Sequence, residues 1–107
     1  MPKNIKKILR ELKTGLRQIY GEQLQSVILY GSYARGDAHP PDSDIDVMIV
    51  LKDYQNYGKE IDRTGELVSV LSLEYGISIS RVIMKESQWK DSDTPLLRNI
   101  RAEGLPA

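Results

Sequence analysis

The sequence has no cysteine among its 107 residues and contains a single histidine. Without a thiol the chain can form no disulfide, no thiolate metal site and no cysteine nucleophile, and nothing in it indicates an oxidising compartment. A long hydrophobic run is missing as well. In particular, the first residues, MPKNIKKILRELK, alternate charged with apolar side chains. Neither a signal peptide nor a membrane span is therefore predicted, and a soluble cytoplasmic protein is the expectation.

The chain also lacks an excess of either charge, since 15 Lys and Arg residues balance 15 Asp and Glu residues. It has no overall field to hold a polyanion, so long nucleic acid is not an expected partner, although a local basic cluster is compatible with this total. Apolar residues make up 40% of the sequence, which is ordinary for a globular protein. At this length we expect one domain, residues 1–107, with one core and one cleft.

The spacing of apolar residues predicts three helices, over 5–19, 61–75 and 95–103. Gly21 and Gly76 are placed to end the first two helices. A Thr-Pro pair before the third offers an N-cap followed by proline at the first helical position. The first helix is amphipathic, with Lys and Arg on its remaining faces, so we expect it to pack on another element.

Three short apolar stretches with β-branched residues predict strands, at 26–30, 44–51 and 77–84. A loop over 31–43, rich in Gly, Pro and Asp, joins the first two, with a helical turn expected at 33–35, and the segment around Trp89 is predicted to be irregular. The order helix, strand, strand, helix, strand, helix predicts an α/β sandwich, in which helices cover at least one face of a small mixed sheet. The polar segments around Gly31 and Asp44 would then lie at one edge of this sheet.

Gly31 and Ser32 open the loop directly after an apolar strand. Backbone N–H groups and a hydroxyl at this position suit phosphate oxygens, and glycine lets a ligand approach the backbone closely. Small Gly-Ser turns are also common where no ligand binds. This pair therefore needs a second feature before it indicates a phosphate site.

Asp44 and Asp46 supply that second feature. Alternate strand residues project to the same side roughly 7 Å apart, so both carboxylates can converge on shared cations. Mg²⁺ binds proteins through one or two carboxylates and completes its shell with water and substrate phosphates. Two ions about 4 Å apart could stabilise the attacking and leaving oxygens of an in-line displacement. The pair indicates phosphoryl or nucleotidyl transfer, and the plain alternative is a solvated strand end.

Taken in order, the residues from Gly31 to Val47 read GSYARGDAHPPDSDIDV. This stretch resembles the signature of the minimal nucleotidyltransferases of the DNA polymerase β superfamily, whose pattern is Gly-Ser, a variable residue, Ala-Arg-Gly and then Ser-Asp-x-Asp. The resemblance is close over about a sixth of the chain, and the small size and element order fit the rest. It implies a polymerase-β-like nucleotidyltransferase fold. It also implies an enzyme with ATP as its substrate and Mg²⁺ as its cofactor, for which Mn²⁺ can substitute.

The resemblance also assigns roles to individual residues. Asp44 and Asp46 would be the metal ligands and the catalytic residues. Nucleotide binding would fall to four residues, Gly31, Ser32, Arg35 and Ser43. Gly31 and Ser32 would hold the β and γ phosphates, and Ser43 would set the start of the strand. For Arg35 two roles stay open: it neutralises triphosphate charge, or it pairs with a carboxylate and braces the loop.

One position departs from the family pattern, which includes a third carboxylate on the strand after the second helix. There the sequence reads ISISRVIM, so Ser78 or Ser80 stands where an aspartate is expected. A serine hydroxyl is neither a base at pH 7 nor a strong Mg²⁺ ligand. Nucleotide binding could therefore persist while transfer is slow or absent, unless Asp37 or Asp42 of the loop substitutes.

Many members of this family are similar in being antitoxins paired with a helical HEPN-domain ribonuclease toxin, in which they adenylylate a tyrosine. The resemblance thus implies transfer of AMP from ATP to a hydroxyl and a hetero-oligomer with a HEPN toxin. Two alternatives stay open. The acceptor is a small molecule, as for the similar aminoglycoside nucleotidyltransferases, or the protein binds nucleotide and neutralises its partner by contact alone. His39 has no evident orienting partner, and we expect an exposed loop residue.

Overall fold

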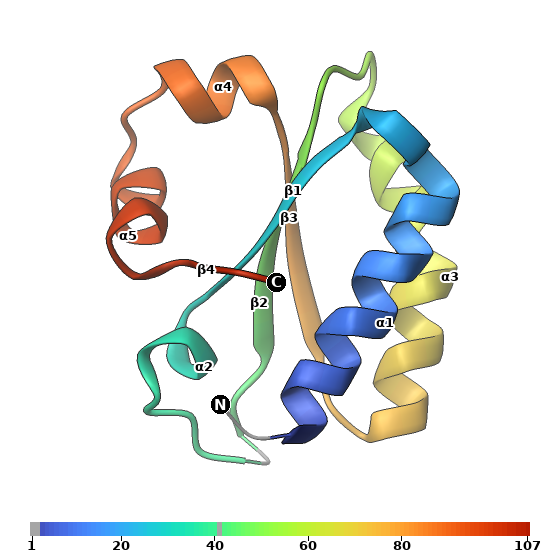
Figure 1. The fold of residues 1–107 in the computed structure, drawn as a ribbon, viewed down its shortest axis with the longest axis vertical. Helices are drawn as coiled ribbons and strands as arrows, with labels where there is room; N and C mark the ends of the chain where they lie inside the picture. Colours follow the sequence, from blue (N-terminus) through green and yellow to red (C-terminus); the bar gives the residue numbers. More distant parts are fainter. Residues whose placement is uncertain (1–2, 41) are drawn as a thin grey trace.

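The computed structural model describes residues 3–40 and 42–107. Its elements are, in chain order, α1 (Lys3–Tyr20), the 3₁₀ turn η1 (Gly21–Gln23), β1 (Leu24–Tyr30), α2 (Ser32–Arg35), β2 (Ile45–Leu51), α3 (Tyr57–Tyr75), β3 (Ile79–Lys85), α4 (Glu86–Asp91), α5 (Pro95–Glu103) and β4 (Leu105–Pro106). None of the helices in these two ranges is both long and apolar enough to cross a membrane. The sheet runs through the middle of the molecule, with α1 and α3 on one side and α4 and α5 on the other (Figure 1).

The four strands form one mixed sheet in the order β3-β2-β1-β4, which confirms the predicted fold class. Strand β2 runs parallel to β3 and antiparallel to β1, and β4 pairs antiparallel with β1. The strand β4 was not predicted, because two residues are too short to show any periodicity. This topology leaves β1 and β2 as the central strands, and they connect through the loop that carries the predicted site.

The larger core lies between the sheet and the two long helices. Leu12 and Leu16 of α1 are completely buried there, as the helical spacing predicts. Polar side chains within this layer have partners: Arg81 of β3 donates to Thr64 Oγ1 of α3 at 2.8 Å, and the Tyr20 hydroxyl donates to Glu60 Oε1 at 2.9 Å. Across the described ranges no buried side-chain nitrogen or oxygen lacks a hydrogen-bond partner. This side of the sheet is a closed, satisfied core.

A smaller core covers the opposite face, where Met48 and Val50 of β2 pack against Leu97 and Ile100 of α5. The segment around Trp89, predicted to be irregular, forms the helix α4 instead. Its sequence, ESQWKD, has a single large apolar residue, so no periodic signal is visible. The helix starts where the Lys85 backbone N–H donates to the Gln88 side chain at 3.0 Å, and Trp89 packs against the smaller core.

Candidate active site

The predicted phosphate loop and the two aspartates meet at one end of the sheet. Because β1 and β2 are antiparallel, the end of β1 at Tyr30 lies opposite the start of β2 at Asp46. The helix α2 and the loop after it extend from this end, in the lower part of Figure 1. The expected position at an edge of the sheet was wrong in one respect: β3 and β4 flank the pair, so the site lies on the two central strands.

Gly31 brings the loop into contact with the carboxylate of Asp46. Its φ of +75° lies in a region that other residues rarely adopt, and a Cβ atom there would lie 2.3 Å from Oδ2 of Asp46. From this point the chain turns at once into α2, because the Gly31 carbonyl accepts from the backbone N–H groups of Ala34 and Arg35. Glycine at this position is thus required by the backbone angle and by the neighbouring carboxylate.

Ser32 is the first residue of α2, next to that contact. Its carbonyl accepts from the backbone N–H groups of Gly36 and Asp37, both at 3.0 Å, and this closes the helical turn. The turn predicted at 33–35 is therefore present, one residue longer at its start. Ser32 thus follows directly, in the chain, the glycine that contacts Asp46.

Asp44 and Asp46 form an electrostatically unfavourable pair. Asp46 is half-buried, and this burial is the main cause that raises its pKa; the negative charge of Asp44 raises the pKa further, whereas Arg35 lowers it. A bound cation would relieve both the desolvation and the repulsion. Within 3–40 and 42–107 no cluster of three or more Asp, Glu or His residues could hold a metal by itself. Two carboxylates nevertheless fit Mg²⁺, which takes its other ligands from phosphates and water.

Arg35 lies between the loop and the end of α5. Its Nη1 contacts both carboxylate oxygens of Glu103 at 3.2 Å, and its Nε contacts Oδ2 of Asp37 at 3.2 Å. Oε1 of Glu103 also accepts from the backbone N–H of Gly31 at 3.3 Å. Glu103 thus ties Arg35 and Gly31 together, an arrangement that matches the bracing role considered for Arg35.

Sequence reasoning missed Glu103, which is 68 positions from Arg35. Nothing in the local sequence separates this glutamate from other helical glutamates. The one available signal was its place in the last turn of a helix just before Gly104, where an unpaired acid is unfavourable near the negative end of the helix dipole. An acid in this position calls for a basic partner.

Ser43 closes the loop just before β2. Its Oγ accepts from the backbone N–H of His39 at 2.8 Å, and its own N–H donates to the carbonyl of His39. The hydroxyl therefore fixes the approach to Asp44 from within the loop. The side chain of His39 is exposed, in agreement with the expectation for this histidine.

The strand register decides between the two serines considered for the third acidic position. Ser80 of β3 lies beside Asp46 of β2, and residues in register on parallel strands point to the same face. Ser78 lies before β3, where its carbonyl accepts from the Ile45 N–H at 2.9 Å. Ser80, which is exposed, is thus the serine of the two that lies next to Asp46.

Known proteins resemble this chain in sequence and in fold. It is 40% identical over 80 residues to a protein of Methanocaldococcus jannaschii named "Putative protein adenylyltransferase MJ0141", a match that covers 75% of this chain and 79% of the relative. A chain from a structure described as a toxin-antitoxin with AMP-PNP gives a TM-score of 0.61 at 22% identity, over 89% of this chain and 68% of that one. A complex of tri-AMPylated Shewanella oneidensis HEPN toxin with MNT antitoxin gives 0.53 at 17% identity, over 92% and 70%.

At these low identities the structural matches show the fold alone, whereas the sequence matches show the family. A family profile described as "Nucleotidyltransferase domain" matches residues 9–104, which contain every residue of the site described above. The fold, the contact between Gly31 and Asp46 and the sequence relatives are all consistent with one family. This chain therefore belongs to the nucleotidyltransferase domain family, as its Gly-Ser and Asp-x-Asp pattern predicts.

Proposed function

We propose that this protein transfers AMP from ATP to a hydroxyl of a partner protein, namely a tyrosine of a HEPN toxin, with which it forms a hetero-oligomer in the cytoplasm. The observation that carries the proposal is the contact of Gly31 with Asp46. It places the start of the predicted phosphate loop directly against a carboxylate suited to Mg²⁺. A triphosphate bound to the loop would have its charge next to the one group in the site that needs a cation.

In this proposal some residues of the site bind the nucleotide or position the loop, and others bind the metal ion. Gly31 and Ser32 hold the β and γ phosphates, while Arg35 and Ser43 keep the loop in place. Asp44 and Asp46 hold Mg²⁺, which when bound neutralises phosphate charge and stabilises the attacking and leaving oxygens. The acceptor oxygen forms a bond to the α-phosphorus of ATP, the bond to the bridging oxygen breaks, pyrophosphate leaves, and the acceptor proton passes to water.

A protein acceptor is supported by the shape of the site and by the relatives. Asp44 and Ser80 are both exposed, so the acceptor side is open and does not enclose a small molecule. The relative from Methanocaldococcus jannaschii is named a protein adenylyltransferase, and one structure with the same fold contains an AMPylated HEPN toxin. A small-molecule acceptor is the weaker candidate on these grounds.

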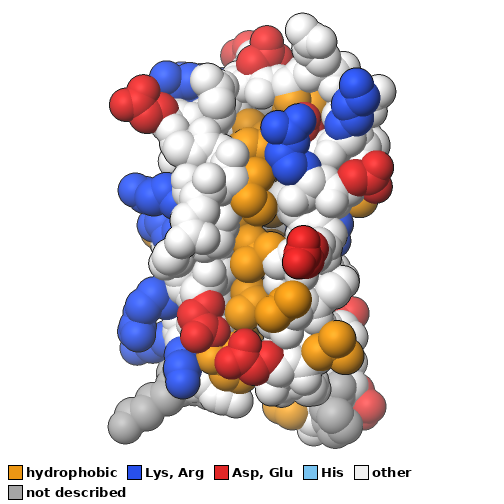
Figure 2. All heavy atoms as spheres, turned by 90° about the vertical axis from the view of Figure 1, so that its right-hand side faces the viewer, with side chains coloured by type: hydrophobic (Ala, Val, Ile, Leu, Met, Phe, Trp, Pro, Cys, Tyr) orange, Lys and Arg blue, Asp and Glu red, His pale blue; other side chains and the backbone are white. Residues whose placement is uncertain are grey.

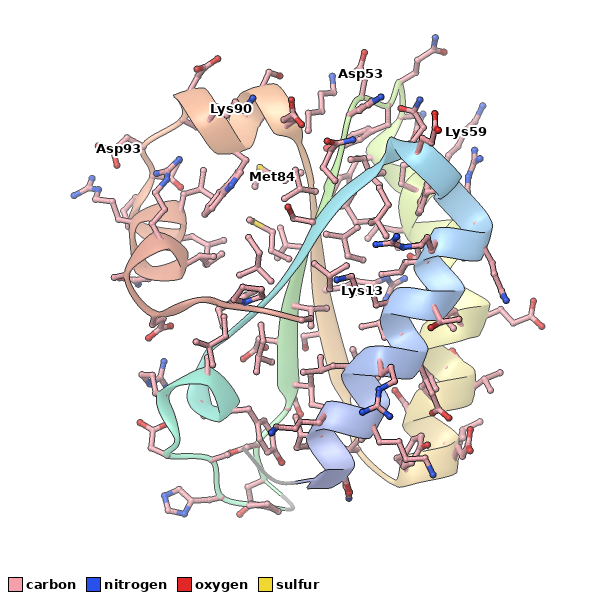
Figure 3. All side chains as sticks on the ribbon, viewed as in Figure 1. Lys13, Asp53, Lys59, Met84, Lys90 and Asp93 are labelled. Atoms are coloured by element: carbon pink, nitrogen blue, oxygen red, sulfur yellow. The ribbon has the colours of Figure 1, made fainter. Side chains whose placement is uncertain are left out.

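The test is transfer of labelled AMP. Purified protein, labelled ATP and Mg²⁺ are incubated with HEPN-domain proteins from the same organism, and mass spectrometry locates the modified residue. We expect label on a tyrosine, reduced by about 10²-fold or more in Asp44→Ala. Asp53→Ala is the matched control, because Asp53 is an exposed aspartate after β2, away from the loop (Figure 3), and should leave transfer unchanged. Absence of label with both Mg²⁺ and Mn²⁺ would contradict the proposal.

One observation favours a second function, nucleotide binding without transfer. Ser80 stands beside Asp46 where a carboxylate would orient or deprotonate the acceptor. A protein of this kind would neutralise its partner by contact alone. Calorimetry separates the candidates when combined with the transfer assay: ATP binding that requires Mg²⁺ and is lost in EDTA, together with no transfer, would establish the second function.

A further inference from the structure

The outer face of α1 carries a groove that shares no residue with the candidate active site. Lys6, Arg10, Lys13 and Arg17 line it from the helix, and Pro106 lines it from β4. Its volume is about 700 Å³. We call this feature the α1 groove. In Figure 3, Lys13 reaches from α1 toward β4, where its Nζ donates to the carbonyl of Ala107 at 2.9 Å.

The charge of the α1 groove has one sign. The four basic residues follow one another at spacings of four, three and four, so they share one face of the helix. The single acidic residue of α1, Glu11, does not line the groove; its carboxylate accepts from the Tyr75 hydroxyl of α3 at 2.6 Å. In the part of the chain that the structure describes, none of the four basic residues forms an ion pair.

This concentration of charge contrasts with the neutral total. The α1 sequence has six Lys and Arg residues and one acidic residue, a net charge of +5. The rest of the chain has nine basic residues against fourteen acidic ones, a net charge of −5. Figure 2 shows basic side chains gathered along its left-hand edge, over α1. Like charges so close together repel, and an acidic ligand would remove that repulsion.

Apolar surface lies between the charges. Exposed Pro106 and half-buried Ala107 contribute to the lining, and the methylene stems of the lysines and arginines add to it, whereas Leu9 beneath them is only 4% exposed and belongs to the large core. The four basic residues extend over twelve residues, from Lys6 to Arg17, or about 16 Å of helix, which is three turns. A ligand that fits must carry acidic groups along a length of three helical turns and must also have apolar groups.

We propose that the α1 groove binds an acidic amphipathic helix of a partner protein. Its acidic side chains would pair with Lys6, Arg10 and Arg17, and its apolar side chains would lie against Pro106 and the methylene stems of these residues. This is the mode in which an amphipathic helix occupies a groove. Such binding does not depend on nucleotide transfer, because the groove and the active site have no residue in common.

Nucleic acid fits this surface less well. The lining contains no aromatic side chain on which a base could stack. A phosphate backbone would also leave the apolar surface of Pro106 and of the lysine and arginine stems without a partner. An acidic helix satisfies both the charge and the apolar surface, which is why we choose it over RNA.

The probe is a synthetic peptide of about 16 residues, with Glu on one face at spacings of four, three and four and Leu beside them. Fluorescence anisotropy and chemical-shift mapping follow its binding to the full chain. We expect a Kd on the order of 10 μM with shifts confined to α1 and β4, and at least tenfold weaker binding of a scrambled peptide of the same composition. Equal binding of the two peptides would overturn the proposal.

Matched charge reversals test the location. The double variant Lys6→Glu/Arg10→Glu should weaken peptide binding at least tenfold. The control is Lys52→Glu/Lys59→Glu, two exposed lysines outside the groove, which should bind as the unmodified protein does. Circular dichroism checks that both variants keep their helix content. Equal weakening in both variants would mean general charge attraction and would overturn the proposal.

Two further measurements decide between occupants. A single-stranded RNA oligonucleotide that carries the same charge as the peptide should bind more weakly. Tighter RNA binding that Lys6→Glu/Arg10→Glu abolishes would make the groove a nucleic-acid site and refute the helix proposal. Size-exclusion chromatography should show the same oligomeric state for the unmodified protein and this variant. Loss of a dimer in the variant would assign the groove to a second copy of the chain.

Discussion

The two faces of the sheet differ in how completely they are covered. On one face, α1 and α3 bury a large apolar layer, and even its polar groups are paired, as when Arg81 donates to Thr64. On the other, α5 and Trp89 cover Met48 and Val50, but the cover does not extend over Asp46. The face covered by α1 and α3 therefore provides most of the stability, and the face covered by α5 carries the candidate active site.

Strand β2 serves both faces because its side chains alternate. Val47 and Ile49 point into the large core, whereas Asp46 and Met48 point to the opposite side. The carboxylate that we assign to metal binding is therefore held by a strand that is anchored from behind. A site built on such a strand keeps its geometry better than one built on a loop.

The largest expected effect is on stability, in a variant of the covered face. Leu12→Ala removes a fully buried side chain and should lower the free energy of unfolding by about 3 kcal/mol. The affinity for Mg²⁺ and ATP, measured by calorimetry well below the unfolding temperature, should change less than about twofold, because distant sites are nearly independent.

Met48→Ala is the matched variant on the other face. Met48 is equally buried, and its side chain lies on the same face of β2 as Asp46. A similar loss of stability should come with ATP binding weakened by about fivefold, because the cavity lets the start of β2 shift. Equal effects of the two variants on ATP affinity would refute the division between the faces.

The next effect concerns the contact between the loop and Asp46. Gly31→Ala introduces a methyl group 2.3 Å from Oδ2 of Asp46 at a φ of +75°, and should weaken ATP binding by about 30-fold, or roughly 2 kcal/mol. Gly36→Ala is the milder comparison: its φ of +83° and ψ of +16° lie in the left-handed helical region, whereas the ψ of −156° at Gly31 suits glycine alone, and no atom lies within 4 Å of the new methyl group at Gly36. Gly36→Ala should lower the free energy of unfolding and leave ATP binding unchanged. Calorimetry that finds the two variants equally weak in ATP binding would show that neither the backbone conformation of Gly31 nor its contact with Asp46 has a special role in binding.

A smaller effect should follow from restoring an acid beside Asp46. If transfer occurs as proposed, Ser80→Asp should raise its rate about tenfold, because a carboxylate there can accept the proton of the acceptor hydroxyl. Ser78→Asp is the control, since Ser78 lies before β3 and out of register with Asp46. Initial rates of labelled AMP transfer give the comparison. A gain in Ser78→Asp but not in Ser80→Asp would contradict the assignment of Ser80.

The sequence was sufficient for features that depend on local spacing. The helices α1 and α3, the loop from Gly31 and the pair Asp44 and Asp46 each leave a pattern within a few residues, and the fold class follows from their order. The family resemblance rests on the same short segment. Periodicity and turn chemistry thus located the predicted phosphate and metal residues before any contact was known.

Features that depend on pairing between distant segments could not be predicted in this way. Glu103 contacts Arg35 across 68 positions, and only the register of β2 with β3 places Ser80, rather than Ser78, beside Asp46. The helix α4 and the strand β4 are too short to show a period. The closed loop at Ser43 likewise depends on a backbone contact with His39 that the residue types do not specify.

The smallest expected effect is a gain in stability from the site itself. Burial, and then the charge of Asp44, raise the pKa of Asp46, so at neutral pH its charged form is less favourable in the folded than in the unfolded protein. Asp46→Asn should therefore increase the free energy of unfolding in EDTA, by roughly 0.5 kcal/mol, because solvent screens this half-exposed group.

The pH dependence of this gain follows from the sign of the pKa shift. A raised pKa means that the penalty is absent where Asp46 is protonated in both states and grows as the pH rises through its titration. Thermal unfolding should thus show the two proteins converging as the pH falls to about 4, where aspartates protonate. Addition of Mg²⁺ and ATP should reverse the order, since only the unmodified site gains a bound cation. A variant that is less stable in EDTA at pH 7 would show that Asp46 is not the electrostatically strained group of the open face.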